Sequence, residues 1–272
     1  MYPHVHHRQD QPILDVHKLS LRYDGHMALE GISFHLHVGE RVAVVGPNGA
    51  GKSTLFKLIA GVLAPTSGQV SVYGSGPRGH VCIAFIPQRS QVDWRFPVNV
   101  ADVVMMGRSA KLRPLTWPGK HDWQLVREAL RTVELGDLEK RQIGQLSGGQ
   151  QQRMFIARAL AQEAELMLMD EPLAGLDAPS QEGLLSLLAR LQEKRVTVMV
   201  ATHDLQQAAQ YFDRILLINQ RIIAFGMPEQ VLKPQTLVQA YGGRLRLVDG
   251  EMGMLAMDDT CCEGGEEHEH AH

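Results

Sequence analysis

The segment that most constrains this chain is the glycine-rich stretch at residues 46–54, Gly-Pro-Asn-Gly-Ala-Gly-Lys-Ser-Thr. It matches the phosphate-binding pattern G-x-x-x-x-G-K-[ST] at every position. An apolar, β-branched run over 41–45 precedes it and predicts a buried strand, and residues 55–60 after it predict a helix. Because the motif requires a strand, a turn and a helix in this order, a chance match in a glycine-rich turn explains the sequence less well. We therefore begin from a nucleoside triphosphate site.

Each residue type in this loop suits the binding of phosphate. Glycines at 46, 49 and 51 (Gly46, Gly49 and Gly51) allow the backbone N–H groups to point into one concavity. A helix that begins near Lys52 adds the positive end of its dipole. We expect Lys52 to reach the β- and γ-phosphates and the Ser53 hydroxyl to ligate Mg²⁺. The other residues that we assign to the ATP-binding loop are Asn48, Ala50 and Thr54.

Length and composition limit the class of protein. The chain has 272 residues, of which 44% are hydrophobic, and this is enough for one large α/β domain. A net charge of −3 does not favour nucleic-acid binding by bulk charge. No apolar run approaches the roughly 18 residues of a membrane-spanning helix, residues 1–8 lack the apolar core of a signal peptide, and three cysteines do not form a disulfide framework. We expect a cytosolic chain whose membrane role comes through a partner.

The order of predicted elements divides the chain. We expect a flexible N-terminus at 1–12, one main domain at 13–243, and an acidic, His-rich and disordered tail at 244–272. Within the main domain, strand-like runs disappear over about 89–162 and helical patches replace them, which predicts a helical insertion.

Strands alternate with helices elsewhere, which predicts a largely parallel sheet with ligands at the carboxyl ends of its strands. Gly46, Gln88, Asp170 and His203 each follow the end of a predicted strand. We therefore expect these four positions to converge on one edge of the sheet.

Asp170 and Glu171 end an apolar strand and have the chemistry to complete the phosphate site. A carboxylate at Asp170 can hold Mg²⁺, through water, beside Ser53. Glu171 would then lie near the γ-phosphate and orient or deprotonate the attacking water. The alternative is an acidic pair that caps the next helix, which the complete phosphate loop makes the weaker interpretation.

The sequence Leu-Ser-Gly-Gly-Gln at 146–150 opens a predicted helix. A serine hydroxyl, free backbone N–H groups and a helix N-terminus can together bind an anion. The alternative is an ordinary serine-capped helix. That alternative is disfavoured by the full string, which stands some 20 residues before an apolar strand that ends in Asp-Glu.

These motifs, in this order, resemble those of the ATP-binding-cassette (ABC) ATPases. The resemblance covers roughly residues 13–243 and rests on 46–54, Gln88, 146–150, 166–171, 174–177 and His203. It implies an α/β fold of the P-loop NTPase type: an ABC nucleotide-binding domain with a RecA-like core sheet, an antiparallel β subdomain and an inserted α-helical subdomain. ATP and Mg²⁺ are the cofactors that it implies.

The resemblance also implies a role for individual residues. Tyr23 resembles the aromatic residue that stacks on adenine, and Gln88 the glutamine that senses Mg²⁺ and the attacking water. His203 resembles the switch histidine that contacts the γ-phosphate and steadies Glu171, and Asp177 the aspartate at the subunit interface. In the family, two copies associate head to tail. Four residues of one copy would then complete the phosphate site of the other: Ser147, Gly148, Gly149 and Gln150.

Segments outside the shared motifs point to a branch of the family. Residues 88–98, 103–108, 211–213 and 223–226 look like the ATPase subunits of bacterial manganese, iron and zinc importers. This implies a membrane permease that contacts the chain near Gln88–Val98, and a periplasmic or lipid-anchored metal-binding protein. The chain would lie at the cytoplasmic face of the membrane.

Local features of this segment leave an alternative open. Trp94 and Phe96, between charged neighbours, would form an apolar cup for the permease, with local core packing as the other interpretation.

Two further functions remain as alternatives. One is the ATPase subunit of an importer for ferric siderophores, haem or another solute. The other is a soluble ABC ATPase outside transport, although the chain has no basic patch with interleaved aromatics for nucleic acid. Histidines do not decide between them. His35 and His37 predict a solvated strand face in preference to a metal site, and the terminal histidines (His4, His6, His7, His268, His270 and His272) predict a solvated tail.

Overall fold

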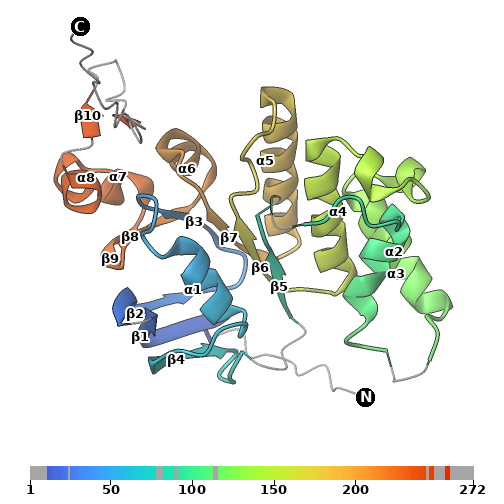
Figure 1. The fold of residues 1–272 in the computed structure, drawn as a ribbon, viewed down its shortest axis with the longest axis horizontal. Coiled ribbons are helices and arrows are strands. Elements are labelled where there is room, and N and C mark those ends of the chain that lie inside the picture. Colours follow the sequence, from blue (N-terminus) through green and yellow to red (C-terminus); the bar gives the residue numbers. More distant parts are fainter. Residues whose placement is uncertain are drawn as a thin grey trace, which may run out of the picture.

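The computed structural model describes residues 11–23, 25–77, 82–88, 90, 92–112 and 116–242, together with the backbone of 245–247 and 255–257. Its centre is a six-stranded sheet (Figure 1). The strand order is β5 (Ile83–Ile86), β6 (Leu166–Asp170), β7 (Thr197–Ala201), β3 (Arg41–Val45), β8 (Arg214–Asn219) and β9 (Arg221–Gly226). Neighbouring strands from β5 to β8 are parallel, and β9 pairs antiparallel with β8. The predicted α/β fold with a mostly parallel core sheet is confirmed.

From β5 to β8 both faces of the core sheet are largely buried, so these strands are mostly apolar and do not alternate with polar residues. In β6, Met167 and Met169 belong to the core on one face, and Leu166 and Leu168 belong to the core on the other. The first core includes side chains of the helices from α2 to α8, and the second includes α1 (Lys52–Ile59) and a small antiparallel sheet. The phosphate-binding loop therefore emerges from β3 between two packed layers.

The small antiparallel sheet has the order β2 (His26–Leu36), β1 (Leu14–Tyr23) and β4 (Ser67–Val72). Alternate residues face the core, as period-two sequences require. His35 and His37 lie on the outer face, with ring centroids 5.4 Å apart. Among the described residues no group of three or more His, Cys, Asp or Glu side chains is arranged to hold a metal ion. Both histidines are exposed, which agrees with a solvated strand face.

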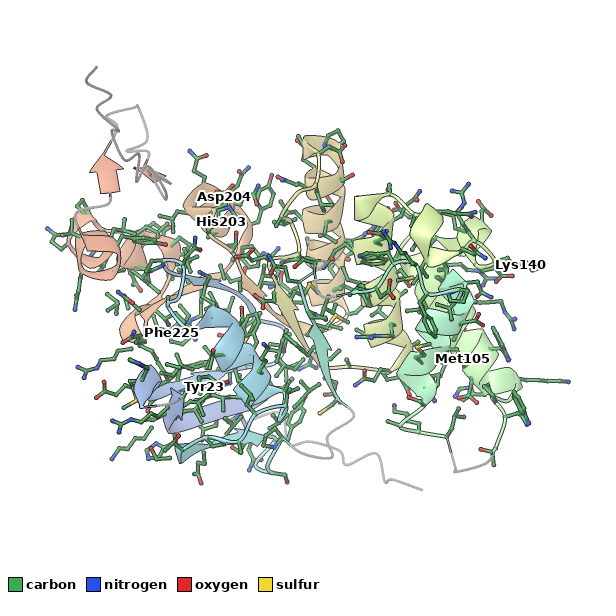
Figure 2. The ribbon with its side chains drawn as sticks, viewed as in Figure 1. Tyr23, Met105, Lys140, His203, Asp204 and Phe225 are labelled. Carbon is green, nitrogen blue, oxygen red and sulfur yellow. The ribbon has the colours of Figure 1, made fainter. Side chains whose placement is uncertain are left out.

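A helical subdomain lies between β5 and β6 in the sequence. It contains α2 (Val100–Met105), η2 (Met106–Arg108), α3 (Lys120–Thr132), η3 (Gly136–Leu138), η4 (Ile143–Gln145) and α4 (Gly148–Ala161). The buried Arg108 guanidinium holds its parts together, since it bonds Asp122 at the start of α3, Glu163 after α4 and the Ala161 carbonyl. Figure 1 shows this subdomain beside the β5 edge of the sheet, and Figure 2 labels Met105 and Lys140 within it.

The last part of the described chain returns to the core sheet. It comprises α5 (Ala178–Glu193), α6 (Leu205–Tyr211), α7 (Pro228–Val231) and α8 (Pro234–Tyr241). Two three-residue strands, β10 (Leu245–Leu247) and β11 (Leu255–Met257), then pair antiparallel within the segment for which the sequence predicts disorder. The terminal histidines and Cys261 and Cys262 lie outside the described residues.

Candidate functional site

The phosphate-binding loop has the backbone that its glycines predict. Gly49 and Gly51 have positive φ values of 80° and 97°, a region that side chains with a Cβ avoid. At Gly46 space is the limit, because a Cβ there would lie 2.1 Å from the Ile218 carbonyl oxygen. The loop ends in α1, which begins at Lys52, so the N–H groups of its first turn have no partner within the helix. These features form a concavity of backbone donors for anions.

Lys52 lies within the loop that it serves. Its side chain is buried, and Nζ donates to the carbonyl oxygens of Gly46 at 2.7 Å and Pro47 at 3.1 Å. Burial lowers the pKa of Lys52, while the carboxylates of Glu171 and Asp170 oppose this effect. The ammonium group thus lies where loop carbonyls and acidic groups compensate for its desolvation, at the point that bound phosphates would occupy.

Strand register brings the acidic residues to the same edge. Asp170 at the end of β6 pairs with Ala201 of β7, and Ala201 pairs with Val44 of β3, one residue before the last of that strand. Asp170 is buried, and its neighbour Glu171 is half-buried. The sequence predicted that Asp170 and the loop would meet at this edge, and the parallel order β6–β7–β3 brings them there.

Gln88 and Glu171 contact each other directly. The Gln88 Nε2 donates to Glu171 Oε2 at 3.0 Å, although 83 residues separate the two in sequence. Glu171 has a φ of 47°, a left-handed conformation that is uncommon for a residue with a side chain. Its N–H also donates to the Ala201 carbonyl at 3.1 Å. Backbone and side chain of Glu171 are therefore both held in place, and a backbone of this kind is often found at functional positions.

A cavity of about 440 Å³ adjoins this pair of residues. Gln88, Val92, Trp94, Glu171 and Gly175 are among the residues that line it. It joins the candidate catalytic carboxylate to the segment for which the sequence predicts contact with a membrane partner.

Trp94 and Phe96 behave differently from the single cup that the sequence suggested. The Trp94 ring packs edge-on against Phe155 of α4, with centroids 5.7 Å apart, and is half-buried. Phe96 is 57% exposed. The core-packing alternative therefore holds for Trp94, and Phe96 alone presents an apolar side chain to solvent.

Tyr23 and His203, two further residues of the predicted ATP site, lie on other elements (Figure 2). Tyr23 is the last residue of β1 and is 44% exposed. His203 lies exposed between β7 and α6, followed by Asp204, which caps α6 through the Gln207 N–H. Asp177 is exposed at the position before α5 and makes no capping hydrogen bond with its side chain.

The signature segment caps a helix. Ser147 is the N-cap of α4: its hydroxyl accepts from the Gln150 N–H at 3.3 Å, and its own N–H donates to Gln150 Oε1 at 3.0 Å. Gly149 lies close to α5, since a Cβ there would meet the Ser180 hydroxyl at 2.9 Å. Figure 1 shows α4 packed with α2 and α3, while α1 lies beyond β5 and β6. The helix that Ser147 caps therefore belongs to the helical subdomain, on the far side of β5 and β6 from α1.

The residues at the sheet edge suit Mg-ATP. The side chains of Ser53, Gln88 and Asp170 carry hydroxyl, amide and carboxylate oxygens, and oxygen is the ligand atom that Mg²⁺ prefers. A set with a single carboxylate leaves coordination positions for phosphate oxygens and water. The curved loop supplies N–H donors, and Lys52 supplies a cation. The chain therefore has the groups that a nucleoside triphosphate with its metal requires.

The sequence did not predict one support of the loop. Gln220, in the turn between β8 and β9, donates from its N–H to the Ala50 carbonyl at 2.9 Å and accepts from the Glu30 N–H at 2.8 Å. It thereby joins the phosphate loop to β2. The positive φ of 59° at Gln220 belongs to the tight hairpin turn between β8 and β9.

The comparisons with known proteins agree with this fold. A family model described as ABC transporter matches residues 29–174. The chain belongs to this family, and it is an ATPase of the ATP-binding-cassette type. Among the described residues, the helices are too short or too polar to cross a membrane.

Individual relatives are similar over nearly their whole length. The manganese transport system ATP-binding protein MntB of Bacillus subtilis is 46% identical over 233 residues, which cover 85% of this chain and 93% of the relative. The zinc transport system ATP-binding protein TroB of Treponema pallidum is 45% identical over 235 residues, covering 85% and 88%. A solved chain of an inward-facing ABC transporter, described as of the metal-chelate type, has a TM-score of 0.76 and 32% identity, covering 90% of this chain and 96% of that one.

Proposed function

We propose that this chain is the ATP-hydrolysing subunit of a bacterial importer for divalent metal ions, with manganese, zinc or iron as the transported ion. The observation that carries the proposal is the 46% identity along 93% of a manganese transport ATPase, in a chain with a complete ATP site. The transported ion would be cargo of a membrane permease.

The proposed chemistry is the hydrolysis of ATP to ADP and phosphate at the edge of the core sheet. The loop N–H groups and Lys52 would hold the phosphates. Ser53 and Asp170 would hold Mg²⁺, which would supply positive charge to the phosphate oxygens. Glu171, fixed by Gln88 at 3.0 Å, orients or deprotonates the attacking water. His203 contacts the γ-phosphate from the loop before α6. Tyr23 supports the adenine base by stacking.

The proposed assembly is a head-to-tail dimer. Ser147, Gly148, Gly149 and Gln150 form the start of α4, which lies in the helical subdomain on the far side of β5 and β6 from α1. Ser147 is exposed there, and a helix start of this kind can bind an anion. In a dimer these residues would contact the γ-phosphate bound by the other copy, with Asp177 at the interface. ATP binding would close the dimer, and hydrolysis would reopen it.

The proposed contact with the permease lies near Gln88–Val98, at the cytoplasmic face of the membrane. Phe96 is exposed there, and the cavity of about 440 Å³ reaches from this segment to Gln88 and Glu171. Because Gln88 bonds the catalytic carboxylate, a movement of the permease at this segment would act on hydrolysis directly. A periplasmic or lipid-anchored protein would deliver the metal ion to the permease.

The experiment that tests the function is uptake of Mn²⁺, Zn²⁺ and Fe²⁺, measured side by side in cells that lack this gene. We expect loss of uptake for one of these ions, restored by the wild-type gene and not by the Glu171→Gln variant. Unchanged uptake of all three ions, with a ferric chelate or haem no longer imported, would overturn the metal-ion assignment. That outcome would support the alternative importer, which the likeness to a metal-chelate type transporter favours. Unchanged uptake of every solute would instead indicate an ATPase outside transport.

A further inference from the structure

Tyr241, the last residue of α8, carries a buried hydroxyl that the catalytic site does not use. The residue is 7% exposed, and its ring lies in the same core as Val45 and Leu217. Among the described residues its oxygen has no hydrogen-bond partner. Buried tyrosine hydroxyls normally find a partner, because leaving one unpaired is costly. An unpaired hydroxyl at this position therefore requires an explanation.

The nearest explanation lies in the phosphate loop. Burial raises the pKa of Tyr241, and the Gly46 N–H opposes this effect, which brings the phenol oxygen and this N–H into the same neighbourhood. Val45, the residue before Gly46, belongs to the same core as Tyr241. The approach of the N–H to the phenol oxygen nevertheless does not meet the geometry of a hydrogen bond. Gly46 is the first residue of the loop, and its carbonyl oxygen accepts from Lys52 Nζ at 2.7 Å. Gly46 is therefore the residue that links Tyr241, at its N–H, with Lys52, at its carbonyl oxygen.

A second connection ties α8 to the same loop. The Asn219 side chain donates from Nδ2 to the Ala240 carbonyl at 2.9 Å, which pairs an oxygen that the helix end would otherwise leave free. The next residue, Gln220, bonds the Ala50 carbonyl. The hairpin tip therefore holds the end of α8 on one side and the phosphate loop on the other.

We propose that Tyr241 is a positioning residue for the phosphate loop, and that its hydroxyl accepts a hydrogen bond from the Gly46 N–H when a nucleotide is bound. Phosphates compete with the carbonyls of Gly46 and Pro47 for the Lys52 ammonium. Once these carbonyls lose that donor, the start of the loop is free to resettle toward Tyr241. The bound state then gains a hydrogen bond that the free state lacks. The inference rests on nucleotide binding at this loop, and the metal assignment does not affect it.

Tyr241→Phe tests this proposal, because it keeps the ring and removes only the oxygen. We expect the dissociation constant for Mg-ADP, measured by isothermal titration calorimetry with the full chain, to rise about three- to tenfold, the effect of one hydrogen bond. The KM for ATP should rise similarly, with kcat unchanged. Without nucleotide, the melting temperature should stay the same or increase, since the variant no longer buries an unpaired hydroxyl. A residue with only a structural role would lower the melting temperature and leave Mg-ADP affinity unchanged.

Two further variants complete the test. Val238→Ala changes an exposed side chain of the same helix and should leave Mg-ADP affinity as in the wild type. Asn219→Ala frees the end of α8 and should weaken Mg-ADP binding without any change in the Tyr241 side chain. Wild-type affinity in Tyr241→Phe overturns the proposal, whatever its melting temperature. A wild-type chain that binds no Mg-ADP would instead contradict the ATP site itself.

Discussion

The phosphate loop and the signature segment differ in how far one chain completes them. At the phosphate loop, Lys52 is buried among loop carbonyls, and Gln88 already bonds Glu171 at 3.0 Å. At the signature segment, Ser147 is exposed and Gln150 of the same chain satisfies its hydroxyl. The phosphate loop and its neighbours are assembled by long-range contacts within the chain. The signature segment is a helix cap, and its capping hydrogen bonds lie within one helical turn. The difference teaches that Ser147 can cap its helix and also bind phosphate. The cap would keep the segment ordered before the nucleotide of a second chain reaches it.

The largest effect that we predict concerns the assembled region. Glu171→Gln keeps the shape of the side chain and its contact with Gln88 but removes the carboxylate that acts on water. We expect turnover to fall by about 10²- to 10⁴-fold, with ATP still bound and the dimer trapped closed, as measured by phosphate release and size-exclusion chromatography. Glu182→Gln, on the exposed side of α5, is the matched control and should hydrolyse ATP normally. Turnover in Glu171→Gln at the level of this control would remove Glu171 from the mechanism.

Lys52→Ala should weaken nucleotide binding, in contrast to Glu171→Gln, which should slow hydrolysis. The variant loses the cation at the loop, and the Gly46 and Pro47 carbonyls lose their donor. We expect nucleotide affinity to fall at least about tenfold, as for a hydrogen bond to a charged group. Lys57→Ala, five residues further along α1, should bind as the wild type does. If both variants bound ATP equally well in a titration, the loop would bind phosphate without Lys52.

The third prediction concerns acid pH and the helical subdomain that carries Ser147. We expect acid to lower the stability of this subdomain. Burial raises the pKa of Asp122 and of Glu163. At Asp122 the Gly119 N–H and Arg108 outweigh this effect, and at Glu163 Lys111 and Arg108 outweigh it, so both pKa values lie below the ordinary 3.8 and 4.5. Groups with a lowered folded-state pKa stabilise the fold above their unfolded pKa values. This contribution is lost as pH falls through the folded values. We therefore expect the melting temperature to be flat near neutral pH and to fall below about pH 4.5.

Arg108→Met identifies the source of this acid sensitivity. Removing the guanidinium leaves Asp122 without its cation and leaves Glu163 with Lys111 alone. It should cost about 2–4 kcal/mol at neutral pH, below the upper range for buried pairs because Glu163 is partly exposed. Its melting temperature should also depend less on acid. Arg190→Met breaks an exposed pair with Glu134 and should cost about 1 kcal/mol or less. Equal losses in the two variants would mean that the Arg108 network is not what holds the subdomain together.

Much of the fold and site could be predicted because it depends on local sequence patterns. The strand at 41–45, the loop and α1 follow from periodicity and glycine spacing, and polar residues at strand ends indicated the shared edge. The sequence could not show which strand ends are neighbours, so the Gln88–Glu171 contact and the support of Ala50 by Gln220 appear only in the structure. The left-handed backbone of Glu171 has no sequence signal, because non-glycine residues rarely adopt it. Trp94 gave an ambiguous signal, since aromatic residues serve in cores and at surfaces alike.

The measurement that most directly tests the central claim, a site shared between two chains, mixes two inactive variants. Lys52→Ala disables the phosphate loop of one chain, and Ser147→Arg blocks the signature segment of the other. In a mixed dimer one site combines the intact loop of the second chain with the intact segment of the first. If the account is right, an equal mixture recovers about a quarter of wild-type ATPase activity, because half of the dimers are mixed and each has one of two sites intact. No recovery from two folded variants that associate would contradict it, and would place the complete site within a single chain.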